Sequence, residues 1–124
     1  MAPTPLPTDG ELAILQVLWD RGPSTVREVH ERLGRGRAVG YTTVLKLLQI
    51  MNDKGLVRRD ASERSHVYEA RLPRERTQRA LVKDLLQRAF GGSSSALVQR
   101  ALEAAPANAA DLTEIRRLLE EHGT

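Results

Sequence analysis

A stretch of short polar and cationic side chains lies near the middle of the 124-residue chain. Thr42, Thr43 and Gln49 carry hydroxyl and amide groups that can hydrogen-bond to base edges, and a threonine methyl suits the methyl group of thymine. The Lys46 ammonium group can donate a hydrogen bond either to an acceptor on a base edge or to a phosphate oxygen. Tyr41 and Thr42 stand where a helix is expected to begin, so their hydroxyls and the exposed backbone N–H groups can bind phosphate. The stretch therefore has the chemistry needed to contact double-stranded DNA.

The placement of charge around this stretch favours the same partner. The segment from Arg32 to Asn52 contains no acidic residue, and the basic pair Arg58 and Arg59 follows it. Further along, Arg64 and His66 belong to a predicted hairpin, where contact with phosphate is the usual role. The whole chain has 19 Lys and Arg against 16 Asp and Glu, a net charge of +3 that does not by itself demand a nucleic acid. The distribution of charge along the chain, rather than the net charge, therefore indicates DNA as the partner.

Other chemistries lack the residues that they need. The chain has no cysteine, which excludes disulfides, thiolate metal sites and thiol redox sensing. His30, His66 and His122 lie far apart and no pair has i, i+4 spacing, so no metal site is expected. The serines at 93–95 have no glycine-flanked elbow and no nearby histidine, so a serine nucleophile is not expected. The glycine- and arginine-rich loop at 34–37 lacks the glycine spacing of a phosphate-binding loop. We expect no catalytic site, no metal and no cofactor.

Periodicity and capping signals predict the elements that position the polar stretch. A Thr-x-x-Glu capping box begins each of the first two helices, at Thr8 and at Thr25, and these helices run to about residues 20 and 33. A third helix starts near Tyr41, ends near Lys54 and is closed by Gly55 in a left-handed cap. Its apolar stripe has the spacing i, i+3, i+4, i+7 and consists of Val44, Leu47, Leu48 and Met51.

The period changes after the third helix. Residues 56–59 and 65–69 are predicted to be short strands joined by a turn, which makes a hairpin. Three helices followed by a hairpin is the order of a winged helix-turn-helix, in which the third helix enters the major groove and the hairpin lies along the phosphates. The sequence thus predicts a DNA-binding domain over residues 8–72, preceded by a disordered, proline-rich tail over residues 1–7.

Residues 73–124 are predicted to form three amphipathic helices. Pro73 opens the first, which ends at Phe90, while one of the serines at 93–95 and Asn108 can cap the next two. About fifty residues are too few to bury such wide apolar faces alone, so we expect a homodimer; the simpler alternative is that the helices fold back onto the first domain. The side chains expected in the dimer core are Leu81, Leu85, Leu86, Phe90, Leu97, Val98, Leu102, Leu112, Ile115 and Leu119.

Several weak motifs in register resemble the penicillinase-repressor (BlaI/MecI) family of transcriptional repressors. The resemblance extends from Leu6 to His122 and is carried by Glu11 with Leu18-Trp19-Asp20, by Thr25 with Glu28, by Thr43-Val44, Leu47 and Leu56-Val57, by Tyr68, and by Phe90-Gly91-Gly92 with Leu97-Val98. It implies a homodimer that blocks transcription from a dyad-symmetric operator, with intertwined C-terminal helices. It also implies that Thr43, Leu45 and Lys46 occupy base-reading positions.

The sequence departs from the family where induction is concerned. The best-known members carry an Asn-Phe bond that a sensor-linked protease cuts, and the matching positions here are Arg100 and Ala101. The copper-responsive branch ends in Cys-x-Cys motifs, which this chain lacks. Release by a sensor-linked protease of different specificity and release by a small effector both stay open, and the inducing signal is not predicted.

These observations favour a mainly α protein, a winged helix-turn-helix followed by a three-helix dimerisation unit, that acts as a DNA-binding repressor. No apolar run reaches the ~18 residues of a membrane span, and Met1–Pro7 has neither the charge nor the apolar core of a signal peptide. We therefore expect a cytoplasmic protein with no membrane partner. The alternative is a winged-helix protein-interaction module that does not bind DNA, against which the acid-free segment argues.

Overall fold

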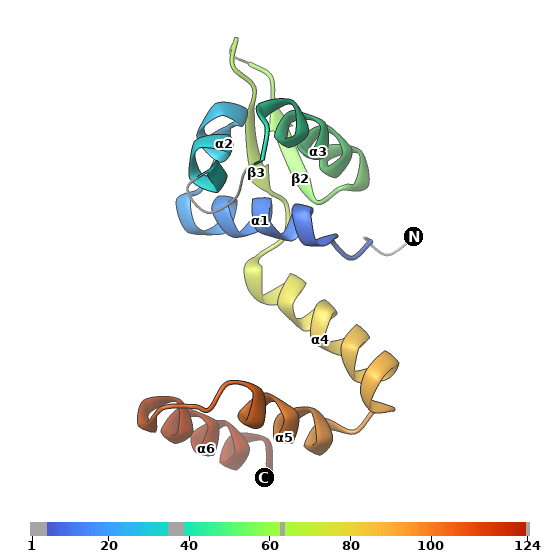
Figure 1. Cartoon of the computed structure of the whole chain (residues 1–124), viewed down its shortest axis with the longest axis vertical. Helices are drawn as coiled ribbons and strands as arrows, with labels where there is room; N and C mark the ends of the chain where they lie inside the picture. Colours follow the sequence, from blue (N-terminus) through green and yellow to red (C-terminus); the bar gives the residue numbers. More distant parts are fainter. Residues whose placement is uncertain (1–4, 35–38, 63, 124) are drawn as a thin grey trace. The chain divides into compact units, whose positions relative to one another are not determined.

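The computed structural model describes residues 5–34, 39–62 and 64–123 of the chain. The elements follow in the order α1 (Asp9–Arg21), β1 (Ser24–Thr25), α2 (Val26–Gly34), α3 (Tyr41–Lys54), β2 (Val57–Asp60), β3 (Val67–Ala70), α4 (Arg74–Phe90), α5 (Ser94–Ala104) and α6 (Ala109–Gly123) (Figure 1). The chain divides into an N-terminal unit, Met1–Leu81, and a C-terminal unit, Val82–Thr124. The predicted mainly α fold, with a winged helix-turn-helix followed by three helices, is confirmed.

The first two predicted capping boxes are both present. In α1 the Thr8 N–H donates to Glu11 Oε1 at 2.9 Å and the Glu11 N–H donates to Thr8 Oγ1 at 3.3 Å. The same reciprocal pair joins Thr25 and Glu28 at the start of α2, at 2.9 and 3.2 Å. Each box satisfies two backbone donors that a helix start would otherwise leave free. Local sequence thus sets the first residue of each of these helices.

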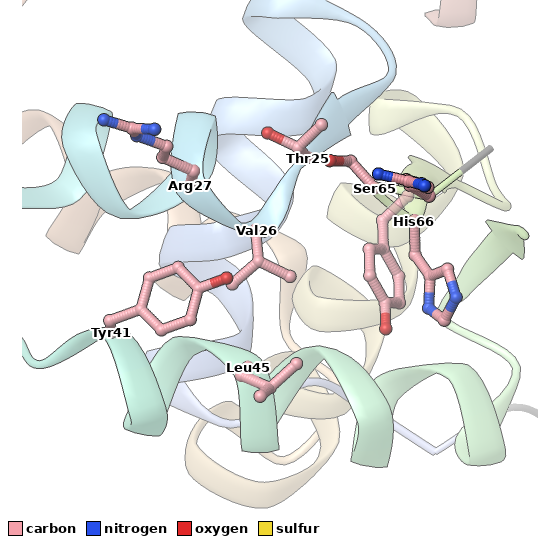
Figure 2. A pocket seen from close by; sticks show the side chains of 9 residues that line it. Thr25, Val26, Arg27, Tyr41, Leu45, Ser65 and His66 are labelled. Carbon is pink, nitrogen blue, oxygen red and sulfur yellow. The ribbon is translucent and has the colours of Figure 1, made fainter.

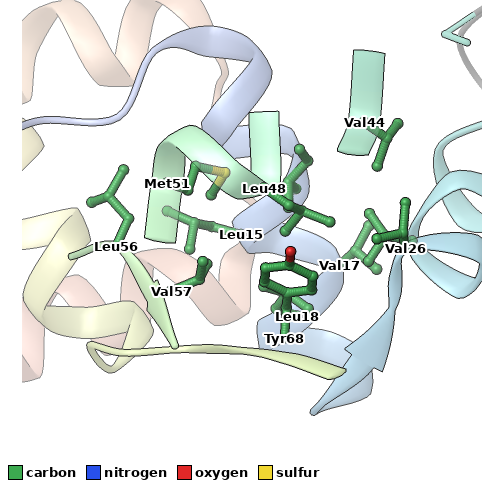
Figure 3. Packing of buried hydrophobic residues seen from close by; sticks show 12 residues of the cluster. Leu15, Val17, Leu18, Val26, Val44, Leu48, Met51, Leu56, Val57 and Tyr68 are labelled. Carbon is green, nitrogen blue, oxygen red and sulfur yellow. The ribbon is translucent and has the colours of Figure 1, made fainter. Parts of the chain in front are cut away.

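One apolar cluster holds the N-terminal unit together, with α1 packed against α2, α3 and β3. From α3 it takes Val44, Leu48 and Met51, three of the four residues of the predicted stripe, while Leu47 is partly buried at the edge. Its remaining members are Ile14, Leu15, Val17, Leu18, Val26, Val29, Leu56, Val57 and Tyr68, most of which are visible in Figure 3. Because this stripe faces the core, the opposite face of α3 faces solvent.

The sheet has one more strand than the sequence predicted. The order is β1-β3-β2, both pairs are antiparallel, and Ser24 of β1 lies opposite Tyr68 of β3. A two-residue strand has no periodicity to detect, so the hairpin alone was predictable. The β1–β3 pairing attaches the start of α2 to the half of β3 nearest the turn of the hairpin, and this hairpin is the wing of the fold. The wing strands begin one or two residues later than predicted.

The C-terminal unit has helices but no buried core of its own. None of the residues of α5 or α6 that the structure describes is buried. The predicted caps are present, with the Ala96 N–H donating to Ser93 Oγ at 3.2 Å and the Asp111 N–H donating to Asn108 Oδ1 at 2.8 Å. Large apolar side chains face solvent along these helices, among them Val82, Leu85, Val98, Leu102, Leu112, Leu118 and Leu119.

Pro5, Leu6 and Pro7 of the predicted tail line a hollow of about 240 Å³ with Leu56 and Thr77, inside the N-terminal unit. The rest of that tail, residues 1–4, and the 35–38 part of the glycine- and arginine-rich loop lie outside the described residues.

Among the helices that the structure describes, none is both long enough and apolar enough to cross a lipid bilayer.

Candidate nucleic-acid interface

A hollow of about 350 Å³ lies where the start of α2, the first turns of α3 and the wing meet. It is lined by Thr25, Val26, Arg27, Tyr41, Leu45, Arg64, Ser65, His66 and Tyr68. Figure 2 shows Tyr41 and Leu45 on α3, with Thr25 and Arg27 across from them and His66 beside them. Four residues predicted to contact DNA, from two segments 19 residues apart in the sequence at their nearest, therefore share one surface.

The other predicted DNA-contacting residues lie on the free face of α3. Thr42, Thr43, Lys46 and Gln49 are all exposed and none of them lines the hollow. Thr42, Lys46 and Gln49 are spaced i, i+4 and i+7, so they form one polar stripe along the helix. In the part of the chain that the structure describes, Lys46 has no hydrogen-bond or ion-pair partner, and neither has Gln49. These donors and acceptors are consequently available to a ligand.

Among the described residues, no side chain caps the backbone donors in the first turn of α3. Gly40 occupies the cap position with an extended backbone, φ −73° and ψ 152°, and it offers no side-chain oxygen to the first N–H groups. Uncapped N–H groups and the positive end of the helix dipole attract anions. Tyr41, whose side chain is 47% exposed, adds a hydroxyl beside them. The start of α3 therefore offers donors to an anion, and a phosphate contact by Tyr41 and Thr42 stays a prediction.

His30 of α2 supports this end of α3 and was not predicted from the sequence. Its Nε2 lies 2.8 Å from the Val39 carbonyl oxygen and, because a carbonyl only accepts, that nitrogen must carry a proton. The His30 ring also meets the Tyr41 ring edge-on, with centroids 5.8 Å apart and planes at 81°. These two contacts hold the residue before the α3 cap and the first residue of α3 against α2.

The wing carries exposed donors. Arg64, Ser65 and His66 are exposed in the turn between β2 and β3, and Arg64 has no hydrogen-bond or ion-pair partner among the residues described. At the other side of the turn, the Ser62 N–H donates to Asp60 Oδ1 at 2.9 Å, which lowers the pKa of the Asp60 carboxyl. Glu63, the acidic neighbour of Arg64 in the sequence, lies outside the described residues. The two predicted wing residues are thus placed where a phosphate can reach them.

Thr25, Arg27 and Ser65 line the hollow but were not predicted as site residues. Arg27 is exposed in the first turn of α2 and makes only a 3.4 Å ion pair with Glu31 one turn away. The capping box locates Thr25 at a helix start, yet only the β1–β3 pairing brings that start beside the wing. A pairing over such a distance has no local sequence signal, which is why these residues were missed.

A buried ion pair anchors the far end of α3. Lys54 Nζ donates to both carboxylate oxygens of Glu11, at 3.1 and 2.9 Å, and the Glu11 side chain is only 1% exposed. Burial by itself raises the pKa of Glu11, but the Thr8 N–H and the Lys54 ammonium group outweigh it and hold the pKa below its ordinary value. The last turn of α3 is therefore tied to α1, at the end opposite to His30.

Across residues 5–34, 39–62 and 64–123, no three His, Cys, Asp or Glu side chains gather in a way that could hold an ion. The site is thus a surface of hydrogen-bond donors and cations around one helix.

Comparison with known proteins gives consistent matches along the chain. The model of the penicillinase repressor family matches residues 7–121. The transcriptional regulator BlaI of Mycobacterium tuberculosis is 37% identical over 115 residues, which cover 91% of this chain and 82% of that protein. The same regulator in a second strain of that species matches equally well.

Two solved structures resemble the N-terminal part of the chain. The solution structure of the DNA-binding domain of the repressor BlaI has a TM-score of 0.53 and 23% identity, covering 60% of this chain and 90% of that one. The monomeric form of Bacillus licheniformis BlaI, solved in complex with the blaP half-operator, has a TM-score of 0.52 and 23% identity, covering 60% and 92%. Both likenesses concern the winged-helix fold.

Proposed function

Because the chain belongs to the penicillinase repressor family, a family of transcriptional regulators and not of enzymes, we propose that it represses transcription as a homodimer on a dyad-symmetric DNA operator. The observation that supports this best is the shared surface of α3, the wing and the start of α2. Beside this surface the polar stripe of α3 is free, and within the described chain no side chain caps the first turn of α3 and Arg64 has no partner. The related Bacillus licheniformis BlaI was solved with a half-operator.

In the proposed complex, α3 enters the major groove and the wing follows the phosphate backbone. The exposed side chains of Thr42, Thr43, Lys46 and Gln49 then meet base edges, with Leu45 packing beside them at the rim of the hollow. Phosphate contacts come from Tyr41 and the free N–H groups of α3, and from Arg64 and His66 on the wing. We add Thr25 and Arg27, because they complete the wall of the same hollow.

We assign DNA binding to residues 8–72 and dimerisation to residues 73–124. The exposed apolar side chains of the C-terminal unit support the second assignment, because a lone unit would leave them in water. Some of these side chains, with Ser94 and Ser95, also line an open apolar hollow of about 520 Å³ on α5 and α6. A second copy of the unit would cover the proposed interface of Leu81, Leu85, Leu86, Phe90, Leu97, Val98, Leu102, Leu112, Ile115 and Leu119, to which we add Val82 and Leu118.

Selection of genomic fragments by the purified protein tests the proposal as a whole. Fragments from the source genome are incubated with the full-length protein, recovered and sequenced. We expect an enriched motif with two inverted half-sites about one helical turn apart, since the two recognition helices of a two-fold dimer face successive major grooves. Recovery without an enriched sequence would favour the alternative, a winged helix that docks onto proteins.

For release from DNA we propose proteolysis at or near Arg100 and Ala101, which are exposed on α5. A cut there separates α6 from the rest of the unit and removes Leu112, Ile115 and Leu119 from the proposed interface, which weakens the dimer and its hold on two half-sites. A small effector is the competing means of release. Immunoblots during derepression decide between them, because intact protein persisting while its promoter is active would exclude cleavage.

A further inference from the structure

The connection between β3 and α4 is short and tied to the N-terminal unit at several points. Only residues 71–73 separate the two elements. The Arg71 N–H donates to the Leu56 carbonyl at 3.0 Å, and Trp19 Nε1 donates to the Leu72 carbonyl at 3.1 Å. The last of the three is a proline, whose ring fixes one of its two backbone torsions. This connection consequently has little freedom to bend.

The first turn of α4 is held in the same way. Arg74, its first residue, forms an ion pair with Asp20 near the end of α1, and its guanidinium carbon lies 5.8 Å from the centroid of the Trp19 ring. Thr77, on the next turn, is only 5% exposed. The Arg74 Nε is buried and has no hydrogen-bond partner among the described residues. The Arg74 side chain therefore holds its position against Trp19 and Asp20 although one of its donors is unsatisfied. We call Trp19, Asp20, Leu72 and Arg74 the latch.

We propose that the latch sets the direction in which α4 leaves the DNA-binding part and thereby determines which half-site spacing the dimer accepts. This rests on the proposed function, since it concerns two DNA-binding units joined through their C-terminal helices. The α4 helix has 17 residues and is about 26 Å long at 1.5 Å per residue. A tilt of about 10° at its base therefore moves its far end by about 4 Å, which exceeds the ~3.4 Å rise of one base pair.

The position of the latch separates this role from DNA reading. None of its four residues lines the hollow between α3 and the wing. Loosening it should therefore leave the contacts of one DNA-binding unit with one half-site unchanged. Loosening the latch should instead change the free-energy cost of placing two such units on one duplex. A flexible connection lowers the effective concentration of the second unit at the favoured spacing and permits binding at other spacings.

The test uses the full-length protein with two changes, Trp19→Phe and Arg74→Ala. The first removes the indole N–H and keeps an aromatic ring, and the second removes the ion pair. The probes are duplexes with one selected half-site, or with two at the selected spacing and at spacings altered by one or two base pairs. We expect the double variant to bind one half-site within about twofold of the unchanged protein, to lose about tenfold on two half-sites at the selected spacing, and to discriminate less among spacings.

Three controls make the outcome decisive. Arg79→Ala removes a charge from the same helix at an exposed residue that has no partner in the described chain, and it should keep the wild-type spacing profile. Exchanging the two charges, Asp20→Arg with Arg74→Asp, should restore part of the discrimination that Arg74→Ala loses. Asp20→Asn neutralises one partner of the ion pair at an exposed residue, so the spacing profile can still be measured if the double variant fails to fold.

The possible results separate this proposal from its premise. An unchanged spacing profile in folded variants would overturn the role of the latch, and so would an equal loss of affinity on one and on two half-sites. If the unchanged protein itself binds two half-sites no better than one, the proposed dimeric repressor is wrong. Trp19 is the only tryptophan in the sequence, so its fluorescence reports directly whether Arg74→Ala and Asp20→Asn have altered the latch.

Discussion

Replacing Lys46 by alanine tests whether α3 is the element that reads the operator. Lys46 is exposed and has no ion-pair partner among the described residues, so its removal breaks no interaction in the free protein. The whole effect must then arise in the complex with DNA. If Lys46 contacts a base edge, the loss is about 1–3 kcal/mol per half-site, which is about 5- to 150-fold in Kd. If it contacts a phosphate only, one fewer counterion is released and the salt slope falls by about 0.9.

The assay is fluorescence anisotropy on a single half-site duplex and on a scrambled duplex, at salt concentrations from 50 to 200 mM. A base contact lowers affinity for the half-site alone, whereas a phosphate contact lowers both affinities by about three- to fourfold more at the low-salt end than at the high-salt end. Lys83→Ala is the matched control, because it removes an equal exposed charge from the C-terminal unit. Equal binding by the Lys46 and Lys83 variants and the unchanged protein would refute the placement of α3 in the groove.

Three further predictions concern the wing, the dimer and the anchor of α3. Arg64→Ala should weaken binding to every duplex alike and lower the salt slope by about one unit, and a curve that overlays the unchanged protein's would exclude a wing contact. The Leu119 side chain is 63% exposed in the single chain, so Leu119→Asp should leave the monomer folded but place an unpaired charge in the proposed dimer interface. Light scattering should therefore give the mass of one chain for Leu119→Asp and of two chains for the control Gln78→Asp. The pKa of Glu11 is lowered by folding, so the stability that its ion pair supplies is present above the ordinary value of 4.5 and is lost as the pH falls through the lowered value. Lys54→Met should therefore cost about 1–3 kcal/mol in denaturant unfolding at pH 7. This cost should shrink as the pH is lowered below 4.5, and a loss that does not change with pH would contradict the pairing.

Local signals in the sequence were sufficient for most of the helices. The capping boxes at Thr8 and Thr25 involve residues three apart, and the α3 stripe repeats within one helix. Such patterns depend on backbone geometry that every helix shares, so they can be identified without knowing the fold. The cap of α5 by Ser93 and the left-handed Gly55 after α3 belong to the same class.

What the sequence could not predict depends on contacts between distant residues. Glu11 and Lys54 are 43 residues apart, and Trp19 and Leu72 are 53 apart. Neither pair has a periodicity, and a buried glutamate is not expected until its cation is located. The contribution of Thr25 and Arg27 to the candidate interface is of the same kind, since it follows from the short β1–β3 pairing.

The N-terminal unit has a closed apolar core, whereas α5 and α6 have no buried residue among those described. This asymmetry has a consequence for regulation. A self-sufficient DNA-binding unit should keep its modest affinity for a half-site whatever happens to the other helices. Joining two such units increases binding by about 10²–10⁴-fold without any new DNA contact, provided that the geometry permits both to bind. Under the proposed function, control of a promoter needs no change at α3, because weakening the proposed C-terminal interface removes this factor. The protein then stays folded but no longer competes for the operator.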